Sequence, residues 1–177
     1  MYVHIPFCKQ KCLYCDFNSF AGQEKKIEQY MEALSLELNR VCKRYQIKEL
    51  DTVYLGGGTP SFIDAKYIDR LLDTLKKEHH LLPETEITIE MNPCTVTHEK
   101  LEIYQNAGIN RVSIGLQTTN DTILREIGRA HTFGEFEQAY QLIREVGFQN
   151  VNVDLMFGLP KQTLDDLQKN VNYLVEI

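Results

Sequence analysis

Tyr2-Val-His-Ile-Pro-Phe-Cys8-Lys-Gln-Lys-Cys12-Leu-Tyr-Cys15 is the stretch around which the rest of this chain is organised. Its three cysteines stand at C-x3-C-x2-C spacing, and thiolates are the usual protein ligands of iron–sulfur clusters. A [4Fe–4S] cubane has one iron more than three cysteines can ligate, so that iron keeps an open coordination position. The spacing therefore predicts a cluster that takes part in chemistry as well as carrying electrons.

Two other uses of these cysteines need to be weighed. Together with His4 they could form a closed Cys3His zinc site. Zinc sites usually pair two knuckles that lie well apart in sequence, whereas here one tight loop supplies every thiol. A disulfide is disfavoured because the chain has 5 cysteines, an odd number, and no signal peptide precedes the motif. A reducing, cytoplasmic location is therefore expected.

Length and composition bound the class of protein. With 177 residues, 43% of them hydrophobic, the chain can bury a core and predicts one domain or part of one. The formal net charge of −6 argues against a nucleic-acid partner held by phosphate contacts. No apolar run approaches the length of a membrane span. The last residues read as a helix that stops without a cap, so we expect residues 1–177 to be a C-terminally truncated domain.

Hydrophobic periodicity predicts strands alternating with helices. The expected strands are residues 2–5, 51–55, 86–90, 111–115 and 151–160 with its loop. The expected helices are residues 24–44, 64–79, 97–106, 133–146 and a last one from about 163. Such alternation predicts parallel β/α units. About five units cannot close an eight-stranded barrel, so the predicted fold class is α/β: a partial, open TIM-like barrel whose last strand is an exposed edge.

Residues capable of chemistry recur at the carboxyl ends of the predicted strands, which is the active-site face of β/α barrels. They are the cysteine loop, the run Gly56-Gly-Gly-Thr59, and then Glu90, Gln117 and Asp154. A glycine run also suits an ordinary tight turn, and a strand-end Glu is often only a surface residue. The run matches neither the dinucleotide-binding G-x-G-x-x-G pattern nor a P-loop.

Four further residues have alternative interpretations. Arg129 could be a surface cation or could pair with a carboxylate. His131 is expected to be a loop histidine with a backbone partner. Cys42 is expected to pack as a small hydrophobic residue on a helix, and Cys94 is not expected to be a ligand, because the first loop already supplies three thiolates.

Several motifs occur together and in order. They are Tyr-x-His-Ile-Pro-Phe-Cys-x3-Cys-x2-Cys, Gly-Gly-Gly-Thr-Pro, Glu-Met-Asn-Pro, Gly-x-Gln, Gly-Arg-x-His and Val-Asp-Leu-Met-Phe-Gly-Leu-Pro. With them the chain resembles the N-terminal part of the oxygen-independent coproporphyrinogen III oxidase family, within the radical S-adenosylmethionine (SAM) superfamily. The resemblance covers essentially the whole chain. It implies a barrel of the radical SAM type, a [4Fe–4S] cluster and SAM.

By this resemblance Cys8, Cys12 and Cys15 would ligate the cluster. Glu90 and Asp154 would accept hydrogen bonds from the ammonium or ribose groups of SAM. The residues expected to form the SAM pocket are Tyr2, Gly57, Gly58, Thr59, Glu90, Gln117, Arg129 and Asp154. An electron donor such as flavodoxin or ferredoxin is the expected redox partner.

Phe17 is the position where the chain departs from the oxidase pattern. True oxidases resemble Cys-x3-Cys-x2-Cys-x-Cys, whereas this chain has Phe17 in place of the fourth cysteine. That substitution resembles the heme-chaperone (HemW-like) branch. Two functions therefore compete: delivery of heme to an acceptor protein, and oxidative decarboxylation of two propionates of coproporphyrinogen III. Phe17 favours heme delivery, and enzyme activity is left open.

Overall fold

The fold is built on one parallel sheet. In the computed structural model, which describes residues 1–78 and 80–177, five strands pair in the order β1-β4-β5-β6-β7 and every pairing is parallel. The strands are β1 (Tyr2–Ile5), β4 (Glu49–Gly57), β5 (His80–Met91), β6 (Arg111–Gln117) and β7 (Asn150–Leu155). The α/β class and the partial, open barrel predicted from the sequence are confirmed.

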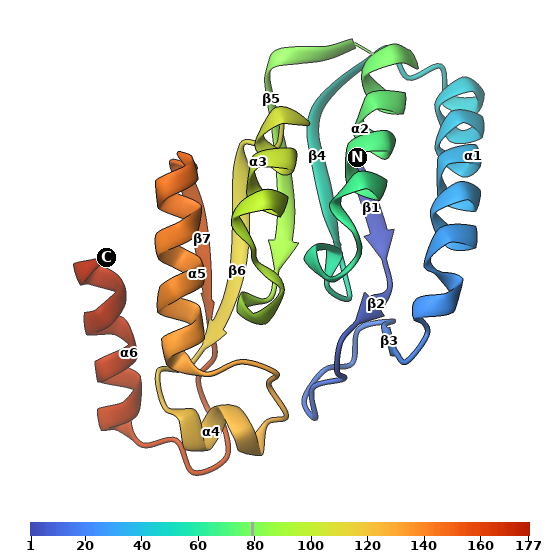
Figure 1. The fold of residues 1–177 in the computed structure, drawn as a ribbon. Helices are drawn as coiled ribbons and strands as arrows, with labels where there is room; N and C mark the ends of the chain where they lie inside the picture. The colour runs from blue at the N-terminus through green and yellow to red at the C-terminus, as the bar shows by residue number, and fades with distance from the viewer. Residues whose placement is uncertain (79) are drawn as a thin grey trace.

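Helices follow the strands along the chain, and all except the short helix α4 (Asp121–Glu126) lie as a layer along one side of the sheet (Figure 1). They are α1 (Ile27–Tyr45), α2 (Ala65–Glu78), α3 (His98–Asn106), α4 (Asp121–Glu126), α5 (Phe133–Val146) and α6 (Leu164–Glu176). Short 3-10 turns precede three of these helices: η1 (Glu24–Lys26) before α1, η2 (Pro60–Phe62) before α2 and η3 (Pro93–Thr95) before α3. The expected end of the second helix at residue 79 falls outside the described residues.

The start of β5 is the main difference from the predicted elements. The sequence predicts a strand at 86–90, but β5 begins at His80 and pairs there with Glu49. The register then shifts between Leu50 and Thr52. Pro83 lies in this early part and cannot donate to a ladder, which is why residues before 86 do not read as a strand.

Alternation along the strands gives the sheet two different faces. One face packs against the helices and forms the core, whose buried residues include Val53, Leu55, Ile87, Ile89, Val112, Ile114, Leu71, Leu72, Leu75, Leu101, Phe136 and Ile143. Full burial of one such side chain contributes about 1.5–3 kcal/mol. The residues between them in the strands are mainly polar and include Tyr54, Glu90, Ser113 and Asp154. The sequence thus builds a dry helical side and a polar opposite face.

Capping residues fix the helices near the end of the chain. Thr132 begins α5 with a capping box to Glu135, and Gly147 ends it in a left-handed conformation with φ 110°. Thr163 begins α6 with a second capping box. These ends match the helices predicted at 133–146 and from 163. Within the described residues, no helix combines the length and the apolar character needed to cross a bilayer.

Candidate functional site

A cavity of about 620 Å³ lies at the carboxyl ends of the strands. Figure 1 shows the cysteine loop and α4 beyond the arrowheads of the sheet, on either side of this region. All but one of the residues predicted for the site line the cavity: Cys8, Cys12, Cys15, Gly57, Gly58, Thr59, Glu90, Gln117, Arg129 and Asp154. The face that barrel topology predicts is therefore the face where these residues meet.

The cysteine loop is closed at its base by a short parallel pairing of β2 (Phe7–Cys8) with β3 (Phe20–Ala21). Cys8 is buried, and its Sγ accepts a hydrogen bond from Oγ1 of Thr59 at 3.6 Å. The amide of Cys15 donates to the carbonyl of Cys12 at 3.2 Å, so the last two cysteines share a tight turn. Among the described residues, no three Cys, His, Asp or Glu side chains gather closely enough to hold one metal ion.

His4 is committed to hydrogen bonds away from the thiols. Its Nδ1 lies 3.0 Å from the hydroxyl of Tyr2, and its Nε2 lies 2.9 Å from the carbonyl oxygen of Asn18. Both ring nitrogens are thus engaged, which does not suit the Cys3His zinc alternative. A cubane cluster, by contrast, needs thiolates on separate irons rather than four ligands on one ion.

Gly57 and Gly58 are required because the backbone from β1 into β2 passes very close to them. Gly57 has φ 120°, and a Cβ there would lie 2.6 Å from Nδ1 of His4. A Cβ on Gly58 would lie 2.8 Å from the carbonyl oxygen of Phe7 and 3.0 Å from Sγ of Cys8. The amides of Gly58 and Thr59 donate to carbonyls of the first strand segment. The glycine run therefore allows β4 to lie directly against the cysteine loop.

Glu90 is held by both of its carboxylate oxygens. Oε1 accepts from the hydroxyl of Tyr54 at 2.8 Å, and Oε2 accepts from the amide of Gly57 at 3.1 Å. Burial, and then the hydrogen bond to Glu90, raise the pKa of Tyr54, so its hydroxyl stays a donor. Gly56 leaves room for this pair, since a Cβ there would lie 2.9 Å from the Tyr54 ring and 3.1 Å from Glu90.

Tyr2 is the predicted pocket residue that the structure places behind the cavity wall rather than on it. Its ring stacks against Tyr54 with centroids 6.1 Å apart, and its side chain is largely exposed. Partial burial of the ring, followed by the negative charge of Glu90, raises the pKa of Tyr2. The register explains this position: Tyr2 pairs with Tyr54, three residues before Gly57. Tyr2 therefore lies further from the strand ends than the other residues.

Asp154 and Gln117 come from the two strands at the open side. Asp154 accepts from the hydroxyl of Ser113 at 3.4 Å and from the amide of Asn152 at 2.7 Å. Gln117 is buried with φ 70°, a left-handed backbone that is rare outside glycine. Its carbonyl accepts from the amide of Met156 at 2.9 Å. Backbone strain of this kind often accompanies a functional site.

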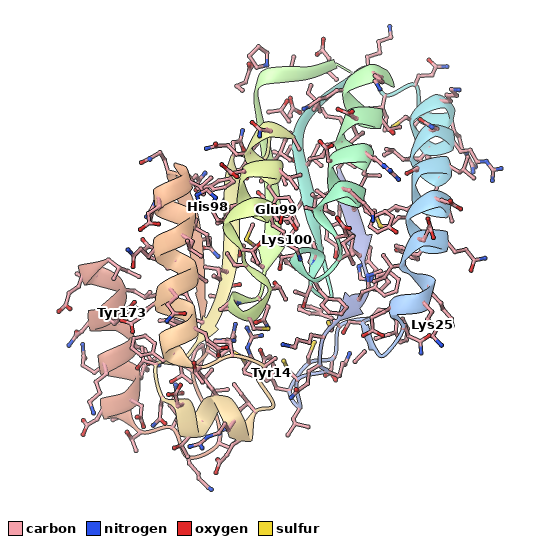
Figure 2. The ribbon with its side chains drawn as sticks, viewed as in Figure 1. Tyr14, Lys25, His98, Glu99, Lys100 and Tyr173 are labelled. Atoms are coloured by element: carbon pink, nitrogen blue, oxygen red, sulfur yellow. The ribbon has the colours of Figure 1, made fainter. Side chains whose placement is uncertain are left out.

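Arg129 reaches across the cavity to the cysteine loop. Its Nη2 donates to the carbonyl of Gly115 at 2.7 Å, and its Nη1 lies 3.4 Å from the Tyr14 hydroxyl and 3.8 Å from Sγ of Cys12. Tyr14, which belongs to the cysteine loop, is labelled in Figure 2. The Nε atom of Arg129 is buried and has no hydrogen-bond partner among the described residues. A buried cationic donor with a spare N–H suits an anionic ligand.

His131 lies buried two residues beyond this arginine. Burial, followed by the cationic charge of Arg129, lowers its pKa to about 3, so the ring is neutral at ordinary pH. Neither of the remaining cysteines is among the residues that line the cavity. Cys42 lies on α1 and is buried in the core, as expected, and Cys94 lies half-buried in η3.

Sequence reasoning missed the residues that support the site. Tyr54, Ser113, Tyr14 and Lys11 all line the cavity. A period-2 alternation was available as a signal for Tyr54 and Ser113, because each lies on the polar face of its strand. Nothing local identifies Tyr14 or Lys11, because their partners depend on how the cysteine loop folds back.

Fold and site together define a β/α protein with a three-cysteine loop over a polar cavity at its strand ends. The family model "Radical SAM superfamily" matches residues 2–174. The chain belongs to the radical SAM superfamily. The family implies a [4Fe–4S] cluster and SAM, and the loop thiols, the Arg129 donor and the glycine-lined wall fit those groups.

Two relatives and one solved structure are similar to this chain over nearly its whole length. The heme chaperone HemW of Bacillus subtilis is 39% identical over 175 residues, which is 97% of this chain and 45% of that relative. HemW of Haemophilus influenzae is 40% identical over 182 residues, covering 100% of this chain and 48% of that relative. The solved structure of coproporphyrinogen III oxidase (HemN) from Escherichia coli superposes with TM-score 0.90 at 31% identity, over 99% of this chain and 41% of its own. The chain thus spans about half the length of the curated relatives it matches.

Proposed function

We propose that this chain is the cluster- and SAM-binding part of a heme chaperone that delivers heme to an acceptor protein. Support comes from the curated HemW relatives, which are 39% and 40% identical, above the 31% identity to the oxidase structure. The observation that carries the choice is Phe17. It stands where oxidases have a fourth cysteine, its side chain is 70% exposed, and it lines the cavity. A phenyl ring there cannot ligate iron or pass through the redox states of a thiol.

In this proposal Cys8, Cys12 and Cys15 hold the [4Fe–4S] cluster. Residues at or just after the strand ends hold SAM together with Arg129 from the loop after α4: Gly57, Gly58, Thr59, Glu90, Gln117 and Asp154, with Tyr2 supporting them from behind. When bound, the cluster can supply one electron to SAM from an iron with an open coordination position.

Each polar residue has a distinct task toward SAM. Glu90, oriented by Tyr54, offers its carboxylate to an ammonium group. Arg129 can hold a carboxylate through its planar guanidinium. Asp154, oriented by Ser113 and Asn152, can accept from ribose hydroxyls. Further parts of the proposal are a cytoplasmic location, an electron donor such as flavodoxin or ferredoxin, and an acceptor protein for heme.

The second candidate is decarboxylation of coproporphyrinogen III, which the likeness to the HemN structure favours. One experiment separates the two. The full-length protein, with cluster and SAM loaded, is incubated with coproporphyrinogen III and a reductant, and heme binding is titrated in parallel. We expect heme binding without protoporphyrinogen. Steady production of protoporphyrinogen would overturn the chaperone proposal and establish the oxidase activity.

A further inference from the structure

Lys11 ties the middle of the cysteine loop to its end. It stands between Cys8 and Cys12 in sequence, and its ammonium donates to the carbonyl of Phe17 at 2.6 Å, to Oγ of Ser19 at 3.0 Å and to the carbonyl of Ser19 at 3.3 Å. These three bonds match the full donor capacity of a lysine ammonium, so the head group of Lys11 is bonded to the loop at every N–H.

Hydrophobic burial does not hold this loop together. Leu13 is 80% exposed and Phe17 is 70% exposed, so the apolar side chains of the loop contact solvent rather than the core. A loop of this kind must be ordered by polar contacts, because the entropy of fixing its backbone is not offset by buried apolar area. All three Lys11 bonds are charge-assisted, which is the stronger class, and the two to Ser19 are partly buried while the one to Phe17 is exposed.

Lys11 works beside other ties that hold different parts of the loop. His4 engages the carbonyl of Asn18, between the two residues that Lys11 binds. On the other side, the amide of Leu13 donates to the carbonyl of Ile127 at 3.0 Å, and Gln10 donates to the carbonyl of Gly128 at 3.0 Å. The outer ties fix the loop to the turn after α4. Only the Lys11 contacts join the segment between the first two cysteines to the segment after the third, among the side-chain bonds of the described residues.

We propose that Lys11 is a positioning residue that closes the cysteine loop so that its three thiols face the cavity together. The inference rests on the proposed function, because it concerns the loop that would hold the cluster. Lys11 also lines the cavity, as do all three cysteines, so the side chain that closes the loop lies on the same cavity as the thiols. Losing it loosens the loop and leaves the sheet and the helical core intact.

Matched variants test this. The wild type, Lys11→Met, Lys11→Arg and the control Lys9→Met are reconstituted anaerobically with iron and sulfide. Lys9 is an exposed lysine of the same loop. The rate of iron release to excess chelator is measured for each, with the thermal unfolding midpoint of each apo protein. Lys11→Met should release iron about tenfold faster than the wild type, or fail to retain a cluster. Lys11→Arg should largely restore retention, because a guanidinium can donate to the same carbonyls.

The outcomes are separable. Release from Lys11→Met at the rate of Lys9→Met would overturn the proposal. So would a large fall in the apo unfolding midpoint of Lys11→Met, because that would make Lys11 a general stability residue. If the wild type takes up no cluster at all, the proposed function fails instead, whatever the Lys11 variants do.

Discussion

Nη1 of Arg129 lies 3.8 Å from Sγ of Cys12, a contact between residues 117 positions apart in sequence. The loop that follows α4 thus brings a permanent cation to a thiol of the cysteine loop. A positive charge and a hydrogen bond beside a cluster sulfur both favour the more negative, reduced state of a cluster. The contact therefore joins the strand-end side of the cavity, where Arg129 bonds to the carbonyl of Gly115, to a thiol of the cysteine loop.

Arg129→Gln should lower the reduction potential of the reconstituted cluster without changing its iron content. The reason is that the variant removes both the cation and the donor from Cys12. The measurement is a redox titration followed by electron paramagnetic resonance in the absence of SAM. Arg125→Gln is the matched control, because the Arg125 guanidinium bonds to Asp121 and Thr122 within α4. If Arg129→Gln and Arg125→Gln had the same reduction potential, the contact between Arg129 and Cys12 would have no effect on the cluster, which would contradict this prediction.

Tyr54→Phe should weaken SAM binding about tenfold, while iron content stays the same. The hydroxyl donates to Oε1 of Glu90 at 2.8 Å, and a bond to a charged group contributes about 1.5–3 kcal/mol. Phenylalanine keeps the ring packing and removes only the bond that orients the carboxylate. Calorimetric titration with SAM measures the effect, and Tyr45→Phe on exposed α1 surface is the control. Wild-type affinity in Tyr54→Phe would show that Glu90 needs no such support.

His131 should make the apo protein less stable in mild acid. Its pKa falls to about 3 in the folded chain, whereas an unfolded histidine titrates near about 6.5. Between those values the unfolded state binds a proton that the folded state does not. The free energy of unfolding therefore decreases as pH falls from about 6.5 toward 3, by at most about 1.4 kcal/mol per pH unit.

Urea unfolding of the apo protein at several pH values between about 7.5 and 4 tests this. His131→Asn should flatten the pH dependence relative to the wild type. His98→Asn is the control, because His98 lies on the exposed surface of α3, where Figure 2 labels it. Equal slopes for wild type and His131→Asn would show that His131 does not cause the loss.

Much of the site could be predicted because barrel topology gathers strand ends. Glu90, Gln117 and Asp154 are separated in sequence, yet each ends a parallel strand of one sheet, so they line one cavity. Tyr2 begins a strand rather than ending one, and accordingly it lies behind that cavity. Position at the end of a parallel strand thus predicts a place in the cavity lining, and residues elsewhere in the chain need another signal.

The supporting contacts could not be predicted, because they depend on the path of the loops. The Lys11 ammonium bonds depend on the chain turning back between Cys15 and Phe20. The guanidinium of Arg129 bonds to the carbonyl of Gly115, and its Nε is buried with no hydrogen-bond partner among the described residues. No local sequence pattern encodes either feature. The pairing of β5 with β4 before residue 86 could not be predicted either, because Pro83 lies in that stretch and the residues around it resemble a loop.

Iron and sulfide analysis after anaerobic reconstitution tests the central claim most directly. The wild type should bind about four irons and four sulfides per chain. Replacing any one of Cys8, Cys12 or Cys15 by Ala should abolish or severely destabilise the cluster, while Cys42→Ala and Cys94→Ala should retain it. Stoichiometric zinc without an iron chromophore in the wild type, or full iron content in all three loop variants, would contradict the account.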